Sequence, residues 1–352
     1  MYLVCTRLLV GTSGDAGSVA RFSSRTLGIS NKLVKATAES LNGAQPLDGE
    51  RPVAVAVTSV SPPVSLTRSW GAVFAELFKA RLTTLVLLTT LVGFYVGSVG
   101  QVNYLLMFHT LLGTAFVAAG ASALNQLLEW KYDAKMRRTR GRPLPAGLLQ
   151  PQTVLWIGSA CSCMGVIYLA SMVNAPTSLL GLVSLLSYLF IYTPLKRVSW
   201  LNTAAGAIPG ALPPLMGWAA ARGELSGPGW TLFAILALWQ LPHFLSIAWI
   251  YRDEYARAGF RMLPGVDPTG ARTGRQAVFH TAGLMLVSLC PFIFGLAGRF
   301  YFIGAFLFGA AFLYSAIQFR RYLTVVRAKH LFLTSIIYLP LLLGLLVIDK
   351  IK

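Results

Sequence analysis

Long apolar runs are the feature that most constrains how this chain can fold. They follow one another from residue 82 to residue 348, separated by short loops. A run of about 20 apolar residues in an α-helix crosses the ~30 Å hydrocarbon core of a bilayer. Hydrophobic residues make up 55% of the chain and charged ones only 12%, as expected for a chain surrounded by membrane lipid. We therefore predict an all-α polytopic membrane protein with nine transmembrane helices, approximately 82–99, 104–130, 152–172, 177–193, 201–220, 229–251, 276–296, 299–318 and 331–348.

Most Lys and Arg residues of the membrane domain lie in the loops between these apolar runs. A formal net charge of +18 could indicate nucleic-acid binding, but the Lys and Arg residues sit in short loops and form no continuous basic face. The loops after the second, fourth, sixth and eighth runs carry most of the cations, whereas the alternate loops hold only Arg222 and Arg299. By the positive-inside rule, the basic loops and the N-terminus face the matrix or cytoplasm. No nucleic-acid partner is predicted.

The first 69 residues differ in composition from the rest. Before Glu39, five basic residues are mixed with Ser, Thr, Gly and Ala, and acids are sparse: the cations are Arg7, Arg21, Arg25, Lys32 and Lys35. This composition is typical of a mitochondrial transit peptide followed by a disordered linker, although residues 3–10 leave a short signal-peptide core open. We expect residues 1–69 to be that targeting segment and residues 70–352 to be the membrane domain, in the mitochondrial inner membrane.

The end of the second apolar run carries the most informative motif. Asn125, Glu129 and Asp133 are spaced i, i+4, i+8, so on a helix they share one face at steps of about 6 Å. A dense cation cluster follows in residues 135–143. Acids at a helix C-terminus oppose its macrodipole and call for a compensating positive charge, either a metal ion or the following arginines. The pattern indicates metal-diphosphate chemistry at a membrane surface; the alternative is a solvated helix end with interfacial salt bridges.

Two other segments add to this pattern. Three prolines, Pro209, Pro213 and Pro214, fall inside the fifth run, so we expect that helix to be broken or kinked and to line a pocket, unless it serves close helix packing. The sixth run ends in residues 251–255, which repeat the combination of acids and arginine. Two such sites on one side of the membrane could hold a polyanion through a metal, although an interfacial Tyr/Arg belt would also explain the second.

His243 lies about 15 Å deeper in the membrane than Asp253, if the helix is regular. An intramembrane imidazole suggests function, but a hydrogen bond to a neighbouring helix is an equal alternative. The four cysteines lack CxxC spacing, which argues against a zinc or disulfide framework. Hydrolase and nucleotide-site motifs are absent, so transport remains as a competing class.

These motifs resemble the intramembrane prenyltransferase superfamily of the UbiA type. Its first motif corresponds here to Asn125, Glu129 and Asp133 followed by residues 136–143. Further agreement lies in residues 192–197, 202–214, 239–244 and 251–255, so the resemblance covers roughly residues 70–348. It implies a helical bundle around a central cavity.

The resemblance, closest to the haem-modifying branch of the superfamily, also implies an activity. It is the transfer of a farnesyl group from farnesyl diphosphate to a vinyl group of haem B, yielding haem O for cytochrome oxidase. Mg²⁺ would be held by Asn125, Glu129, Asp133 and Asp253. Five cations would bind the diphosphate: Arg137, Arg138, Arg142, Lys196 and Arg252. Four residues would contact haem or admit water: His243, Arg197, Tyr251 and Tyr255. Haem A synthase or a second copy of the chain are candidate protein partners.

Two positions depart from the superfamily pattern. Residue 129 is Glu where many members have Asp, and the second motif offers Tyr251 and Tyr255 at the spacing of a DxxxD pair, with Asp253 between them. The second departure resembles the haem-modifying branch and argues against a quinone-synthesis role. A prenyltransferase that accepts a quinone precursor or a chlorin, and a membrane transporter with a charged gate, remain the alternatives.

Overall fold

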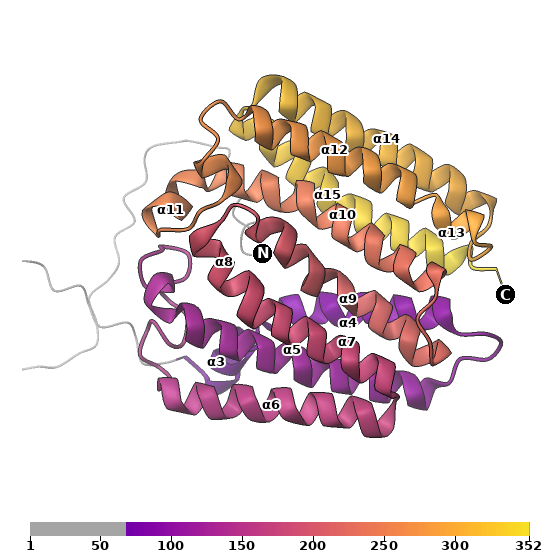
Figure 1. The fold of residues 1–352 in the computed structure, drawn as a ribbon, viewed down its shortest axis with the longest axis horizontal. Coiled ribbons are helices and arrows are strands. Elements are labelled where there is room, and N and C mark those ends of the chain that lie inside the picture. The colour runs from indigo at the N-terminus through magenta and orange to yellow at the C-terminus, as the bar shows by residue number, and fades with distance from the viewer. Residues whose placement is uncertain (1–67, 352) are drawn as a thin grey trace, which may run out of the picture. The chain divides into compact units, whose positions relative to one another are not determined.

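The computed structural model describes residues 68–351, which form a bundle of helices joined by short loops (Figure 1). Eight helices in this part of the chain are long and apolar enough to cross a membrane, close to the nine predicted. The helical elements are α3 (Trp70–Leu77), α4 (Ala80–Gly97), α5 (Tyr104–Asp133), α6 (Pro151–Met172), α7 (Ala175–Leu186), η1 (Ser187–Tyr192), α8 (Thr193–Val198), α9 (Asn202–Arg222), α10 (Gly227–Ile250), α11 (Arg252–Arg257), η2 (Leu263–Gly265), α12 (Ala271–Val287), α13 (Cys290–Ile293), α14 (Arg299–Tyr322) and α15 (Val325–Ile348).

The fifth predicted span, residues 201–220, forms α9, which is helical but differs in composition from the other eight spans. It is rich in Ala, Gly and Pro, so its hydropathy is lower, and it is not among the eight apolar helices. It packs against α4, α7 and α10, and most of its side chains are buried. A helix surrounded by other helices does not need a lipid-facing apolar surface, so small residues suffice.

The three prolines do not break α9, which is continuous over its 21 residues. We predicted a broken or kinked helix, and the structure shows no break. Pro213 has no N–H to donate to the carbonyl of Pro209, and that carbonyl instead accepts a hydrogen bond from Ser184 Oγ of α7 at 3.2 Å. A neighbouring helix thus satisfies one polar group that proline leaves open, as the absence of water in a bilayer requires.

Glycines bring α4 and α9 close together. A Cβ atom at Gly93 of α4 would overlap the carbonyl of Pro214, and one at Gly217 of α9 would overlap the carbonyl of Thr90. In a membrane, helix association depends on such close packing because lipid tails are as apolar as the side chains. The packing alternative for the small-residue segment is therefore the one that the structure supports.

Several helices extend further than their apolar runs. The fourth predicted span, residues 177–193, runs from Ala175 to Val198 through α7, η1 and α8. Helix α15 begins at Val325, six residues before the predicted 331. The short helix α3 was not predicted; Ser69 Oγ caps it by accepting a hydrogen bond from the N–H of Ala72. Apart from Arg68 and Ser69, the predicted targeting segment 1–69 lies outside the described residues.

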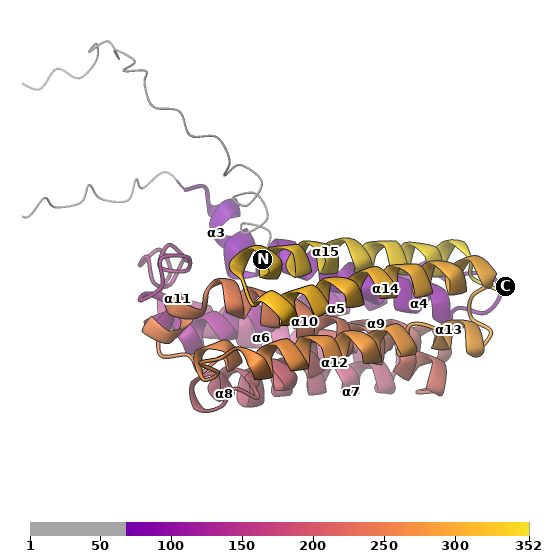
Figure 2. The ribbon, with the colours of Figure 1, turned by 90° about the horizontal axis from the view of Figure 1, so that it is seen from above.

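One end of the bundle collects the loops that carry the candidate site. Figures 1 and 2 place α3, α8 and α11 at the same end. The turn between α14 and α15 also lies there, because the aromatic ring of Phe319 in α14 contacts that of Trp249 near the end of α10, with centroids 5.6 Å apart. The charged segments that the sequence assigned to one membrane side therefore lie at one end of the molecule.

Candidate active site

The site is built around the last turns of α5. Asn125, Glu129 and Asp133 lie on one face of this helix and are 1%, 4% and 3% exposed. Two buried carboxylates beside an apolar bundle are costly unless each is paired and hydrogen-bonded. The neighbouring elements supply those partners.

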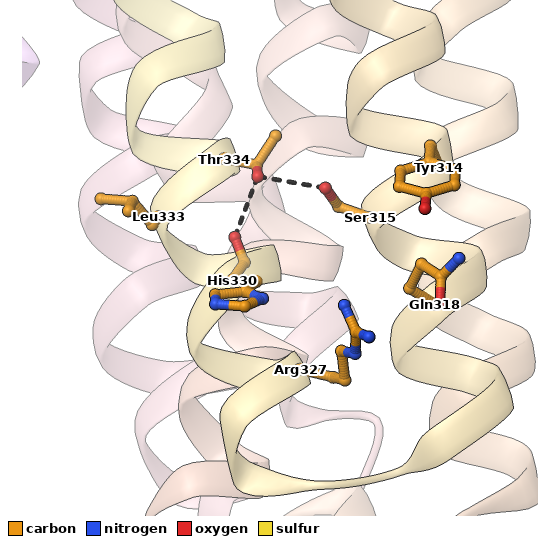
Figure 3. A pocket seen from close by; sticks show the side chains of 7 residues that line it. All are labelled: Tyr314, Ser315, Gln318, Arg327, His330, Leu333 and Thr334. Carbon is orange, nitrogen blue, oxygen red and sulfur yellow. Dashed lines mark hydrogen bonds between the residues drawn. The ribbon is translucent and has the colours of Figure 1, made fainter.

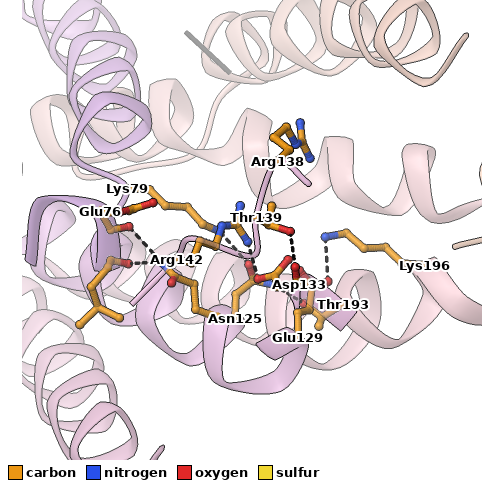
Figure 4. Close-up of polar contacts among 12 residues, drawn as sticks. Glu76, Lys79, Asn125, Glu129, Asp133, Arg138, Thr139, Arg142, Thr193 and Lys196 are labelled. Carbon is orange, nitrogen blue, oxygen red and sulfur yellow. Dashed lines mark hydrogen bonds and ion pairs between the residues drawn. The ribbon is translucent and has the colours of Figure 1, made fainter. Parts of the chain in front are cut away.

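Each carboxylate forms a short ion pair with a cation from another element (Figure 4). Lys196 Nζ of α8 lies 2.8 Å from Glu129 Oε1, and Arg142 Nη1 lies 2.6 Å from Asp133 Oδ2. The hydroxyl of Thr139 donates to the carbonyl of Asp133 at 2.8 Å, which fastens the basic loop to the helix end. Removing one partner from a buried pair typically costs about 3–5 kcal/mol, because the other charge remains buried.

A third cation comes from Lys79, between α3 and α4. Its Nζ donates to Asn125 Oδ1 at 2.7 Å and to the hydroxyl of Tyr188 at 3.2 Å. Lys79 has a φ of 49°, a left-handed conformation that is unfavourable for a residue with a Cβ atom. Burial, reinforced by the positive charge of Arg142, lowers the pKa of the Lys79 amine to about 7. A strained, desolvated lysine is typical of functional sites.

The π-helix η1 positions two tyrosines beside these cations. Tyr188 and Tyr192 stack with ring centroids 5.5 Å apart, and Lys196 Nζ lies 4.4 Å from the centre of the Tyr192 ring. Tyr188 donates to Asn125 Oδ1 at 3.1 Å, and Asn125 Nδ2 donates to Thr193 Oγ1 at 3.1 Å. π-Helical turns occur frequently at functional sites because they shift side chains out of the regular register.

The two motif regions touch through their loops. Arg138 Nη2 lies 3.4 Å from the Tyr255 hydroxyl, so the basic loop after α5 meets α11. Met136 and Phe260 share a small hydrophobic cluster beside this contact. Arg197 donates to the carbonyl of Leu128 at 3.1 Å. The structure thus brings the first motif, the α8 cations and the edge of the second motif together.

Other predicted site residues stand apart from this cluster. The side chain of Asp253 is 87% exposed, and its carboxylate lies 3.8 Å from Arg252 Nε. Arg252 covers the ring of Trp249, with its guanidinium 5.0 Å from the ring centre, and Tyr251 is half-buried at the end of α10. Arg137 is exposed on the loop. The roles assigned to these four residues remain predictions.

His243 is fully buried within α10. Its Nδ1 lies 2.7 Å from Ser335 Oγ of α15, and its ring stacks on Trp239 with centroids 4.8 Å apart. The Trp239 indole N–H donates to the carbonyl of the same Ser335 at 2.7 Å. The neighbouring helix therefore supplies a partner for the imidazole, and the role of His243 towards haem stays a prediction.

The oxygen atoms at the end of α5 suit Mg²⁺ chemically. Among the described residues, no three His, Cys, Asp or Glu side chains form a ready-made metal cluster. Mg²⁺, however, is usually held by one or two carboxylates together with substrate phosphates and water. Glu129 and Asp133 meet that requirement, and the Asn125 amide oxygen adds a third donor on the same helix face.

Sequence reasoning missed three residues of the cluster: Lys79, Tyr188 and Thr193. Tyr188 lies just outside, and Thr193 inside, the segment 192–197 that carried part of the family resemblance. Lys79 directly precedes the first apolar span, where a lysine is usually read as an interfacial anchor. Only the fold places its amine beside Asn125, 46 residues further along the chain.

Comparisons with known proteins agree with this geometry. The chain is 46% identical over 286 residues to a protein named protoheme IX farnesyltransferase from Solibacter usitatus, covering 79% of this chain and 98% of that protein. It is 34% identical over 295 residues to the mitochondrial protoheme IX farnesyltransferase of Arabidopsis thaliana, covering 83% of this chain and 68% of that protein.

Solved structures share the fold at low sequence identity. A digeranylgeranylglyceryl phosphate synthase superposes with a TM-score of 0.69 at 16% identity, covering 79% of this chain and 97% of that one. A UbiA homolog from Archaeoglobus fulgidus bound to DMAPP and Mg²⁺ superposes with a TM-score of 0.55 at 15% identity, covering 78% and 99%. The model of the UbiA prenyltransferase family matches residues 86–339, and this chain belongs to that family.

Proposed function

We propose that this protein transfers the farnesyl group of farnesyl diphosphate to a vinyl group of haem B and so makes haem O. The observation that carries the proposal is the buried cluster in which Lys79, Lys196 and Arg142 surround the polar face of α5. The relatives named protoheme IX farnesyltransferase support haem as the acceptor.

The cations of the site suit the departure of diphosphate. When the allylic C–O bond breaks, its electron pair leaves with the diphosphate, and negative charge grows on the phosphate oxygens. Preorganised cations in a site shielded from water stabilise that charge strongly. Lys79, Lys196 and Arg142 occupy such positions, and Arg138 lies on the adjoining loop.

Mg²⁺ would supply further neutralisation of the diphosphate, held by Glu129 and Asp133 with Asn125 beside them. Asp253 would join only after moving toward the cluster, since its side chain is exposed. The apolar bundle would keep water from the allylic cation until the vinyl group of haem has attacked it. That attack leaves a carbocation on the former vinyl group, and addition of water with loss of one proton gives the hydroxyethylfarnesyl substituent. We also propose that the bundle encloses a central cavity in which this reaction takes place.

We assign the protein to the mitochondrial inner membrane, with the site facing the matrix. The name of the Arabidopsis relative and the composition of the first 69 residues support this location. Haem A synthase, or a second copy of the chain, would be a suitable neighbour because the product leaves into the membrane.

The proposal is tested by incubating the reconstituted protein with farnesyl diphosphate, haem B and a series of Mg²⁺ concentrations, followed by mass analysis of the haem. Asp133→Asn and Glu129→Gln should lower turnover by about 10²–10³, the loss typical for a group that stabilises transition-state charge. Glu224→Gln is the matched control, since it removes an exposed carboxylate from the opposite end of the bundle.

Several results would contradict the proposal. A prenylated quinone precursor with haem B unchanged would assign the protein to another prenyltransferase activity. Solute flux without release of diphosphate would assign it to transport. Full activity of Asp133→Asn across the Mg²⁺ series would refute the metal site.

A further inference from the structure

A second polar site lies between α14 and α15, away from the α5 cluster (Figure 3). It is a pocket of about 240 Å³ lined by Tyr314, Ser315, Gln318, Arg327, His330, Leu333 and Thr334. Pockets that enclose drug-sized ligands measure roughly 300–1,000 Å³, so this one is too small for haem or a farnesyl chain. Its size and its polar lining suit a phosphate group.

At the base of the pocket, a side-chain hydrogen bond joins α14 to α15. Ser315 Oγ of α14 and Thr334 Oγ1 of α15 lie 3.1 Å apart, and Thr334 donates to the carbonyl of His330 at 2.9 Å. The side chain of Gln318 approaches from α14, and that of Arg327 from the first turn of α15. The pocket thus presents amide, imidazole and guanidinium groups, which donate hydrogen bonds to phosphate oxygens, while the protons of the two hydroxyls are used in the bonds between Ser315, Thr334 and His330.

The charge around this pocket is positive and unbalanced. Arg320, Arg321, Arg327 and Lys329 surround the turn, and the chain has no Asp or Glu between Asp267 and Asp349. Within residues 68–351, none of these four cations takes part in an ion pair. Arg327 is half-buried, and its guanidinium lies 5.1 Å from the centre of the Tyr322 ring, which restricts its direction.

An apolar surface continues from the pocket along α15. Leu333, which lines the pocket, is followed at four-residue spacing by Ile337 and Leu341, and these three side chains are 43%, 51% and 45% exposed. Residues at this spacing share one helix face and cover about 12 Å along the axis. A phosphate that carried acyl chains would place its headgroup in the pocket and its chains on this surface. A free phosphate would gain nothing from it.

The position of the pocket also fits a lipid headgroup. The α14–α15 turn lies at the end of the bundle where the basic loops gather, since a Cβ atom at Gly270 would meet Leu323 of that turn at 3.0 Å. Basic pockets between helices on the positively charged side of a membrane protein bind anionic lipid headgroups. We propose that the pocket between α14 and α15 holds the phosphate of an anionic phospholipid from the surrounding membrane.

The test compares lipids retained by the full-length protein in native mass spectra after reconstitution with phosphatidylglycerol or with phosphatidylcholine. Arg327→Gln should weaken retention of phosphatidylglycerol by about tenfold, the loss expected for one charge-assisted hydrogen bond. Lys329→Gln is the matched control, because it removes the same charge from the same turn but lies outside the pocket. It should change retention by less than about twofold.

A second variant distinguishes loss of lipid binding from a folding defect in Arg327→Gln. Thr334→Val removes the hydroxyl from the pocket floor at almost constant volume, and it should also weaken phosphatidylglycerol retention without changing binding of phosphatidylcholine. A third arm titrates inorganic phosphate in place of lipid. Farnesylation measured on the same samples keeps this result separate from the proposed activity, since Asp133→Asn should leave lipid retention unchanged.

Three outcomes would overturn the proposal. The first is an equal loss of retention in Arg327→Gln and Lys329→Gln, which would indicate a diffuse surface charge. The second is equal retention of the two lipids by the unaltered protein. The third is binding of inorganic phosphate as tight as that of phosphatidylglycerol, which would identify the ligand as the free anion.

Discussion

At the scale of single residues, the site depends on how buried charges are paired. The sequence predicted the helix face of Asn125, Glu129 and Asp133, because a period of four residues is enough to place them together. It could not predict which cation meets which acid. The Glu129 partner is 67 residues away, and that choice depends on helix packing.

Lys79 offers the sharpest test of the site at this scale. Its amine contacts Asn125 and Tyr188, so Lys79→Met should weaken binding of farnesyl diphosphate by about tenfold or more through loss of a charge-assisted contact. Lys79→Arg should retain part of the affinity. Isothermal titration in detergent measures both. The control is Lys131→Met, which removes an exposed lysine from the end of α5, the helix that carries Asn125. If Lys131→Met lowered the affinity for farnesyl diphosphate as much as Lys79→Met does, the effect would be due to general surface charge and not to a contact in the site.

His243 can be tested against its own hydrogen-bond partner. If it contributes to the haem pocket, His243→Ala should weaken haem binding by about tenfold more than it weakens farnesyl diphosphate binding. Ser335→Ala breaks the 2.7 Å contact but keeps the imidazole. Haem titration by absorbance and thermal unfolding of both variants are the measurements. If Ser335→Ala reproduces every loss, the imidazole serves packing alone.

At the scale of elements, apolar runs located the helices but not their ends. The run that predicts α15 starts at residue 331, yet the helix begins at Val325 because Arg327 and Lys329 extend it into the interface. Arg and Lys are good helix formers, but a hydropathy pattern does not count them as part of an apolar helix. In α9 the three prolines predicted a broken or kinked helix. The helix is not broken, and a hydroxyl from α7 satisfies a carbonyl that the prolines leave open.

The contact between α4 and α9 yields a prediction about stability. Gly93→Ala adds a methyl group where the Pro214 carbonyl already lies, so the free energy of unfolding should fall by about 1–3 kcal/mol. Gly344→Ala in α15 meets nothing within 4 Å and should leave stability unchanged or raise it by about 0.5–1 kcal/mol. Thermal and denaturant unfolding in the same detergent compare the two. A tolerated Gly93→Ala would show that the helices can separate without loss.

At the scale of the whole molecule, the alternation of charge in the loops predicts a topology. Positions 138, 197, 257 and 321 should face one side of the membrane, and positions 222 and 299 the other. Single cysteines at these positions, in a background without Cys5, Cys161, Cys163 and Cys290, can be labelled from each side of sealed vesicles. Labelling of 138 and 257 from opposite sides would contradict both the topology and the shared site.

The pairing of Glu129 with Lys196 also sets an order of events during synthesis. When α5 enters the membrane, the lysine that neutralises Glu129 has not yet been made, because it lies 67 residues later. An unpaired carboxylate is too costly to bury, so the end of α5 should remain hydrated until α8 arrives. Chains truncated before Thr193 should therefore leave a cysteine at position 125, one turn from the retained Glu129, open to water-soluble thiol reagents, whereas the complete chain, in which residue 125 is buried, protects it. The candidate active site would then be among the last parts of the molecule to leave water.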